Sequence, residues 1–202
     1  MKNKFLLLIV LIAGLATGWM VYNHFRVVIP AVDVNKSEIA WSAKSLSGAH
    51  TGKIMLSKAN LEFQGGKLIG GTFEADMKSI TVTDITDSTE NQHFVEHISD
   101  ADFFEVNNYP KASFTITKVT PLNEQEYEVT GTMRIKEKDS PMTFKATVTP
   151  ADNGQRVSAV VSVDRTLFGI EYGSKGKPGS EPDWFILDEF ILNINVVTSE
   201  NG

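Results

Sequence analysis

Apolar and polar residues alternate through most of the chain, in short runs separated by turn residues. A period of two is typical of antiparallel strands that bury one face. The runs share apolar residues at alternate positions and extend over Ile39 to Ala43, Leu61 to Phe63, Ile69 to Met77, Ala112 to Ile116, Tyr127 to Ile135, Met142 to Val148, Val157 to Val163 and Phe190 to Val196. The pattern predicts about eight strands, and Gly65-Gly66 predicts a tight hairpin turn between the second and third runs.

One apolar face repeated over so many strands favours a closed antiparallel barrel, because closure removes unpaired sheet edges. A barrel of about eight strands is also large enough to hold one small ligand. A two-sheet sandwich with a solid core fits the same periodicity and is the alternative. The predicted fold class is therefore all-β, an antiparallel barrel with one short helix, preceded by an N-terminal hydrophobic segment.

The short helix is predicted where the alternation breaks, from about Glu90 to Ile98. Thr89 and Gln92 have the spacing of a capping box, and Asp87 or Ser88 would also suit the N-cap. The segment between two strand runs is therefore expected to be helical for about two turns.

Two histidines on this helix raise the question of a metal site. His93, Glu96 and His97 have the H-x-x-E-H order of inverzincin metalloproteases, whereas Phe94 and Ile98 form the apolar stripe of the helix. Two histidines supply only two ligands, and zinc sites use three or four. No long helix is predicted downstream to deliver the acidic ligand. We predict neither catalytic nor metal-binding residues, and a zinc-dependent hydrolase using HFVEH is the alternative.

Composition narrows the function classes further. A net charge of −6 argues against nucleic-acid binding, which needs a basic surface. Cysteine is absent, which excludes a disulfide framework, thiolate metal sites and a cysteine nucleophile. No nucleophile elbow and no phosphate-binding loop motif is present. The sequence therefore predicts a protein that is not an enzyme.

The N-terminal segment predicts export. Lys2 and Lys4 precede an apolar run from Phe5 to Tyr22, which has the order of a signal peptide or membrane anchor. Gly14 and Ala16 would suit cleavage, but the run is also long enough to span a bilayer, so cleavage and anchoring both remain open. We expect residues 1–30 to be signal or anchor plus linker, and residues 31–202 to be a domain in the periplasm or cell envelope.

Several strings, in order along the chain, resemble the YceI-like family of polyisoprenoid-binding, lipocalin-like proteins. The most specific is D-F-F-E-V-N-N-Y-P at 102–110, which leads into the next strand. The other similar strings are EIAWSAKSL at 38–46, GGTFEADMKSITVTD at 70–84, YEVTGTMRIKEKDSPMTFKATV at 127–148, VDRTLFGIEYGS at 163–174 and LDEFILNINVV at 187–197. Together they span about Val32 to Val197.

The resemblance implies a lipocalin-like barrel whose interior takes a long apolar chain, such as a polyisoprenoid lipid or an isoprenoid quinone. Two departures concern the ligand. Lys44-Ser45-Leu46 stands where the family often has K-H-L, and the Gly- and Pro-rich loop 173–183 lacks the expected aromatic residue. This loop is predicted to be mobile and to border the mouth of a cavity.

The predicted ligand-binding residues lie on the inward strand faces: Trp41, Ala43, Leu56, Phe63, Phe73, Phe114, Ile116, Met133, Phe144, Val161 and Phe168. Plain core packing is the alternative for each. Phe103 and Phe104 are expected to plug one end of the barrel. The predicted function is binding, storage or transport of the lipid, with membrane contact through the N-terminal segment if it is uncleaved; homodimer formation is left open. A ligand-free module that binds another protein is the other alternative.

Overall fold

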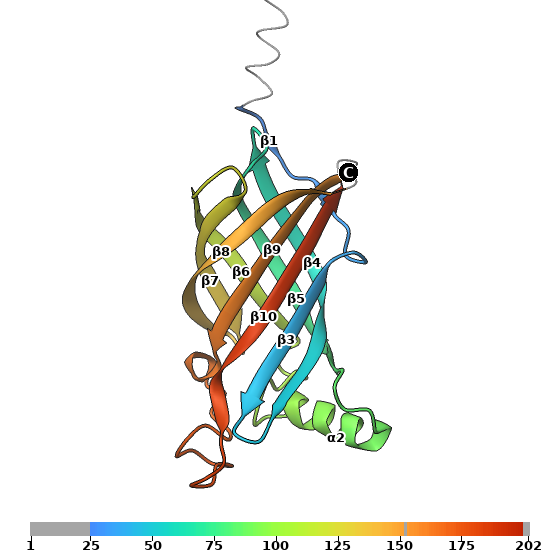
Figure 1. Cartoon of the computed structure of the whole chain (residues 1–202), viewed down its shortest axis with the longest axis vertical. Coiled ribbons are helices and arrows are strands. Elements are labelled where there is room, and N and C mark those ends of the chain that lie inside the picture. The colour runs from blue at the N-terminus through green and yellow to red at the C-terminus, as the bar shows by residue number, and fades with distance from the viewer. Residues whose placement is uncertain (1–24, 152, 200–202) are drawn as a thin grey trace, which may run out of the picture.

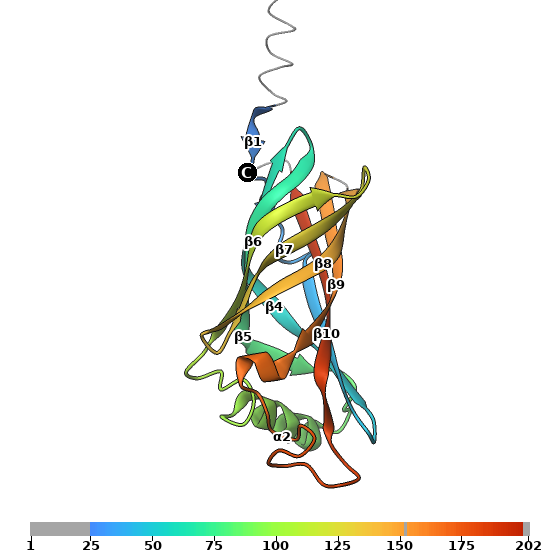
Figure 2. The same cartoon turned by 90° about the vertical axis from the view of Figure 1, so that its left-hand side faces the viewer.

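The computed structural model of the chain describes residues 25–151 and 153–199. Its long strands are β3 (Glu38–Ser45), β4 (Ala49–Gln64), β5 (Lys67–Val82), β6 (Lys111–Pro121), β7 (Glu126–Ile135), β8 (Lys138–Ala151), β9 (Gly154–Asp164) and β10 (Ile186–Ser199). They pair antiparallel in the order β4-β3-β10-β9-β8-β7-β6-β5, and β5 pairs with β4. This ring of eight strands is a closed barrel, as predicted, and not a sandwich (Figures 1 and 2).

Two short strands precede the barrel. β1 (Val27–Val28) pairs with the end of β4, and β2 (Ala31–Val32) pairs with the end of β10. The segment around Pro30, which was expected to be a linker, is thus attached to the sheet on both sides. Across the described residues no helix is long and apolar enough to cross a membrane. The run from Phe5 to Tyr22 lies outside the described residues.

The alternating residues face the barrel interior along nearly all of the predicted runs. Ile69 is the exception, and its predicted inward orientation is wrong, since it is 38% exposed whereas Leu68 is 2% exposed. Glu62 pairs with Gly70 and Phe63 pairs with Leu68, so Ile69 is the extra residue of a β-bulge and the alternation shifts by one. The hairpin turn at Gly65-Gly66 is confirmed, because both glycines have the positive φ values (57° and 79°) that a tight two-residue turn requires.

The helix that breaks the alternation is α2 (Ser88–Ser99), which is longer than predicted. The Asp87 side chain caps it by accepting hydrogen bonds from the backbone N–H groups of Thr89 and Glu90, both at 2.9 Å. The Thr89–Gln92 capping box is therefore wrong, and Gln92 instead donates to the Glu96 carboxylate at 2.8 Å. Asp87 was the right alternative because its short carboxylate reaches both free N–H groups of the first turn.

The two ends of the barrel differ. At one end lie β1 and the last described residues of β10 (Figure 1). At the other end lie α2, the β3–β4 hairpin, the 3-10 helix η1 (Arg165–Phe168) and the long connection from η1 to β10 (Figures 1 and 2). The second end, hereafter the helix end, has the longer connections and is the end that can form a site.

Candidate functional site

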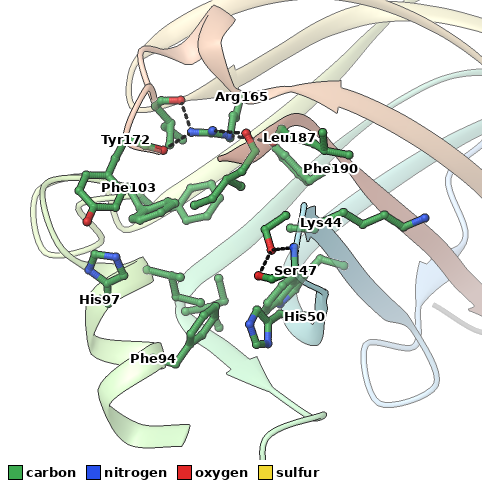
Figure 3. A pocket seen from close by; sticks show the side chains of 18 of the residues that line it. Lys44, Ser47, His50, Phe94, His97, Phe103, Arg165, Tyr172, Leu187 and Phe190 are labelled. Carbon is green, nitrogen blue, oxygen red and sulfur yellow. Dashed lines mark hydrogen bonds between the residues drawn. The ribbon is translucent and has the colours of Figure 1, made fainter. Parts of the chain in front are cut away.

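A cavity of about 270 Å³ opens at the helix end (Figure 3). Most of its wall is aliphatic or aromatic: Trp41, Ala43, Ile54, Ile80, Phe94, Ile98, Phe103, Phe104, Ile170, Tyr172, Trp184, Ile186, Leu187 and Phe190. The polar lining residues are Lys44, Ser45, Ser47, His50, His97 and Arg165. Such a mostly apolar hollow with a few polar groups at its edge is typical of a small-molecule site.

The buried side chain of Arg165 holds one wall of this cavity in place through hydrogen bonds. Only 4% of this residue is exposed, and its guanidinium donates to the carbonyl oxygens of Ile170 at 2.9 Å and Tyr172 at 2.8 Å. It also donates to the carbonyls of Ile186 and Leu187, both at 3.2 Å. All four acceptor carbonyls belong to cavity-lining residues. The buried guanidinium therefore joins residues 170–172 to residues 186–187 in one wall of the cavity. Burial lowers the pKa of Arg165 from its ordinary value.

None of residues 173–183 lines the cavity, but Tyr172 and Trp184, the residues on either side of this loop, do. Trp184, directly after the loop, donates its indole N–H to the Ser47 hydroxyl in the β3–β4 hairpin at 3.0 Å. The backbone N–H of Leu46 donates to the Phe185 carbonyl at 3.2 Å. Trp184 thus joins the chain after the loop to the β3–β4 hairpin across the mouth.

An aromatic cluster forms the side of the mouth next to α2. The His97 ring contacts Phe103 edge-on at 5.0 Å and Tyr172 at 5.2 Å between ring centroids. Lys136 holds the backbone of this segment, because its ammonium donates to the carbonyls of Ala101 at 3.2 Å and Phe103 at 2.9 Å. Phe103 therefore lies at the end of the barrel, as predicted for a plug, and it borders the cavity.

Across the mouth from this cluster lies His50, in β4. Its ring packs against Phe94 of α2 at 4.3 Å between centroids, and its Nδ1 lies 2.8 Å from Oδ2 of Asp84. The other carboxylate oxygen of Asp84 accepts from the Thr51 backbone N–H at 2.7 Å. Partial burial raises the pKa of Asp84, but the hydrogen bonds from Thr51 and His50 outweigh it and leave the pKa below its usual value. Asp84 is therefore an ionised acceptor.

Two smaller cavities continue the first one into the barrel. The nearer, of about 70 Å³, shares Ile54, Phe104 and Phe190 with the large cavity. The farther, of about 60 Å³, shares Phe73, Phe114 and Met133 with the nearer one. Shared walls place the three voids in series, with the Phe104 and Phe190 rings, 6.3 Å apart, at the first partition.

The predicted ligand-binding residues fall into three groups. Trp41 and Ala43 line the large cavity. Those that line the smaller cavities are Phe73, Phe114, Ile116, Met133 and Phe144. Those that are buried and line none of these three cavities are Leu56, Phe63, Val161 and Phe168. The predicted position of Phe168 on a strand face is wrong, because this residue lies on the 3-10 helix η1. A binding role for any of them stays a prediction.

Strand alternation missed the residues that α2 and the connection to β10 contribute to the cavity. Phe94 carried a usable signal, because it lies on the apolar stripe of the helix. Tyr172, Trp184 and Arg165 carried none that spacing could reveal. Their place depends on how the connection folds back over the barrel end.

His93 and His97 are both exposed on α2, and the His97 ring also contacts the rings of Phe103 and Tyr172. Within residues 25–151 and 153–199, no group of three or more His, Asp or Glu side chains has the arrangement to hold a metal ion. The two histidines of HFVEH thus face different surroundings in the described structure.

Solved structures with the same fold include BcnA of Burkholderia cenocepacia, which has a TM-score of 0.69 and 23% sequence identity and covers 83% of this chain and 99% of its own. A polyisoprenoid-binding domain from Saccharophagus degradans, implicated in plant cell wall breakdown, has a TM-score of 0.60 and 10% identity over 85% of this chain and 97% of its own.

Curated sequences that match include a UPF0312 protein of Pseudomonas putida, 35% identical over 97 residues. That match covers 46% of this chain and 49% of the relative, so the chain spans about half the length of the relatives that it matches. The YceI-like domain family matches residues 31–198, which includes the eight barrel strands except the last residue of β10. The chain therefore belongs to the YceI-like family.

Proposed function

We propose that this protein encloses a long apolar lipid, a polyisoprenoid or isoprenoid quinone, within its barrel, and stores or carries it in the cell envelope. The observation that carries the proposal is the series of three voids, which begins with the aromatic-walled cavity of about 270 Å³ at the helix end. A slender chain would follow such a series, whereas a compact ligand would not need it. The polyisoprenoid-binding domain of Saccharophagus degradans has the same fold and supports this assignment.

The energetics favour an apolar chain. Burial of apolar surface contributes about 25 cal/mol per Å², so enclosing about 300 Å² gives roughly 7 kcal/mol before costs. Ordering a flexible chain and restricting its motion offset part of this gain. The large cavity is near the lower end of the roughly 300–1,000 Å³ usual for ligand pockets. A long lipid would therefore displace the partitions and extend into the smaller voids.

The proposed location rests on the N-terminal sequence. Lys2 and Lys4 followed by the apolar run from Phe5 to Tyr22 support export and either cleavage or anchoring in the membrane. Either outcome would bring the barrel close to the membrane from which isoprenoid lipids are drawn.

The direct test is to purify the full chain without added lipid, extract it with organic solvent and analyse the extract by mass spectrometry. We expect about one isoprenoid lipid for each chain, as one barrel interior can hold one. A well-folded sample that contains no such lipid, and that takes up none on incubation, would refute the proposal.

Two matched variants on β3 locate the lipid. Ala43 faces the cavity and Ala40 faces outward on the same strand. Ala43→Phe should fill part of the cavity and lower the lipid content, whereas Ala40→Phe should leave it unchanged. Equal lipid content in the two variants would place the lipid elsewhere.

A further inference from the structure

We propose that the mouth of the cavity selects a lipid whose polar end is a hydroxyl group, and that Nε2 of His50 accepts the hydrogen bond from it. This inference rests on the proposed function and specifies the chemistry of the ligand's polar end. It distinguishes an alcohol or phenol from the corresponding carbonyl, ether or phosphate.

Most polar groups that line the cavity are already engaged within the protein. Arg165 donates to four carbonyl oxygens. The Trp184 indole N–H is bonded to the Ser47 hydroxyl, which also lies 3.0 Å from the Ser45 hydroxyl. The Lys44 ammonium is directed away from His50 (Figure 3). Because these groups are bonded within the protein or directed away, they are not the ones that would bind the polar end of a lipid.

His50 is the polar group best placed for that recognition. It lines the cavity, and its side chain is 42% exposed, so the ring is at the boundary between the apolar interior and water. The Phe94 ring, 4.3 Å away, and Asp84 hold the imidazole in one orientation. A lipid with its chain in the cavity would leave its polar end at this boundary.

The Asp84 carboxylate determines which ring nitrogen of His50 carries hydrogen. An ionised carboxylate can only accept, so the 2.8 Å contact with Oδ2 requires a hydrogen on Nδ1. A neutral imidazole carries one N–H, which leaves Nε2 with a lone pair. Among the described residues Nε2 of His50 has no hydrogen-bond partner. It can accept from a hydroxyl, but it offers nothing to a carbonyl, an ether or a phosphate.

The other free polar groups at the mouth do not reverse this preference. Tyr172 and His97 lie on the opposite side of the mouth from His50 (Figure 3). A tyrosine hydroxyl both donates and accepts, and so does an imidazole whose tautomer no carboxylate fixes, so neither Tyr172 nor His97 discriminates between a hydroxyl and a carbonyl. Selection for a donor therefore depends on His50.

The test compares geranylgeraniol with its methyl ether, which has the same chain but no hydroxyl hydrogen. Binding to the full chain is followed by the fluorescence of Trp41 and Trp184, which both line the cavity, at about pH 8, where imidazoles are ordinarily neutral. We expect the alcohol to bind roughly three- to tenfold more tightly, as one hydrogen bond provides. In His50→Phe, which keeps a ring against Phe94, the ratio of the two affinities should fall to about one.

Two further variants separate recognition from general disturbance of the mouth. His93→Phe changes an exposed histidine on the adjacent helix that lines none of the cavities, and it should keep the wild-type ratio. Asp84→Asn can donate its amide hydrogen to Nδ1 and so allows the hydrogen of the ring to move to Nε2. The ratio should then fall, and ¹⁵N NMR of the imidazole should report the change of tautomer.

The outcomes of this experiment separate the two proposals. Equal binding of the alcohol and the ether by the wild-type protein, or an unchanged ratio in His50→Phe, would overturn the inference and leave the proposed function standing. Failure of both compounds to bind a folded protein would overturn both.

Discussion

Replacing Arg165 with methionine should loosen the cavity wall and lower the stability of the whole barrel. Methionine keeps an unbranched side chain but is shorter and cannot donate to the four carbonyl oxygens that accept from the guanidinium. Two of those bonds, to Ile170 and Tyr172, are short at 2.9 and 2.8 Å. A hydrogen bond from a charged group contributes about 1.5–3 kcal/mol, so these two account for roughly 3–6 kcal/mol gross.

The cost of burying the cation offsets part of this stabilisation, as its lowered pKa indicates. The net loss in Arg165→Met should therefore be about 3 kcal/mol, within the range for breaking a buried charged contact. Urea unfolding measures it as a lower midpoint with an unchanged slope. In Arg165→Met, the backbone amides of residues 170–187 should exchange hydrogen faster than they do in the wild type, because they lose the contact that joins them. The amides of the barrel strands should change less. Lipid binding should weaken in parallel.

Arg134→Met is the matched control. Arg134 forms a fork with Asp139 through contacts of 2.6 and 2.7 Å, but its side chain is 56% exposed. Exposed ion pairs contribute little, so this variant should change stability far less than Arg165→Met. If the two variants lowered the unfolding midpoint equally, or if Arg165→Met left the exchange of residues 170–187 unchanged, the structural role assigned to Arg165 would be wrong.

Three further predictions concern the helix end. Phe104→Ala removes a ring from the partition between the first two cavities, so geranylgeraniol should gain affinity relative to geraniol in a fluorescence titration; equal changes for both alcohols would contradict the series of voids. Asp87→Ala removes the cap of α2 and should lower the free energy of unfolding by about 1 kcal/mol in urea; an unchanged midpoint would show that the cap is not needed. The pKa of Asp84 is below its usual 3.8 in the folded protein, so its carboxylate stabilises the fold above that pH, and this stabilisation is lost as the pH falls through the lower folded value. Asp84→Asn should therefore flatten the dependence of unfolding free energy on pH in that acid range, and a curve parallel to that of the wild type would refute the assignment.

The barrel could be predicted from the sequence because each strand buries one face. Alternation at positions such as Trp41, Ala43 and Phe114 reports which side chains point inward, and this information is local to each run. It fails where local geometry departs from the regular pleat. Ile69 was assigned to the wrong face because it is the extra residue of a β-bulge, and that bulge depends on how β5 pairs with β4.

The candidate site was less accessible to the same reasoning. Every inward residue of a closed barrel is apolar whether it packs tightly or borders a void. Alternation therefore predicted Val161, which is buried and lines none of the three cavities, together with Trp41, which lines the largest of the three. A void is left where side chains from opposite walls of the barrel do not reach each other. The distance between those walls cannot be predicted from the sequence of any single strand.

The all-β class, the position of α2 and the resemblance to the YceI-like family follow from the sequence alone, because they depend on periodicity and on motifs within short segments. Closure into a barrel and not a sandwich depends on the pairing of β5 with β4, which the periodicity does not report. Where the cavity opens, and which polar groups line its mouth, depend on contacts between distant segments of the folded chain. His50 and Asp84 are 34 positions apart in the sequence, and Arg165 reaches carbonyls on both sides of a long loop. Such contacts exist only once the barrel has closed and its end connections have folded over the opening.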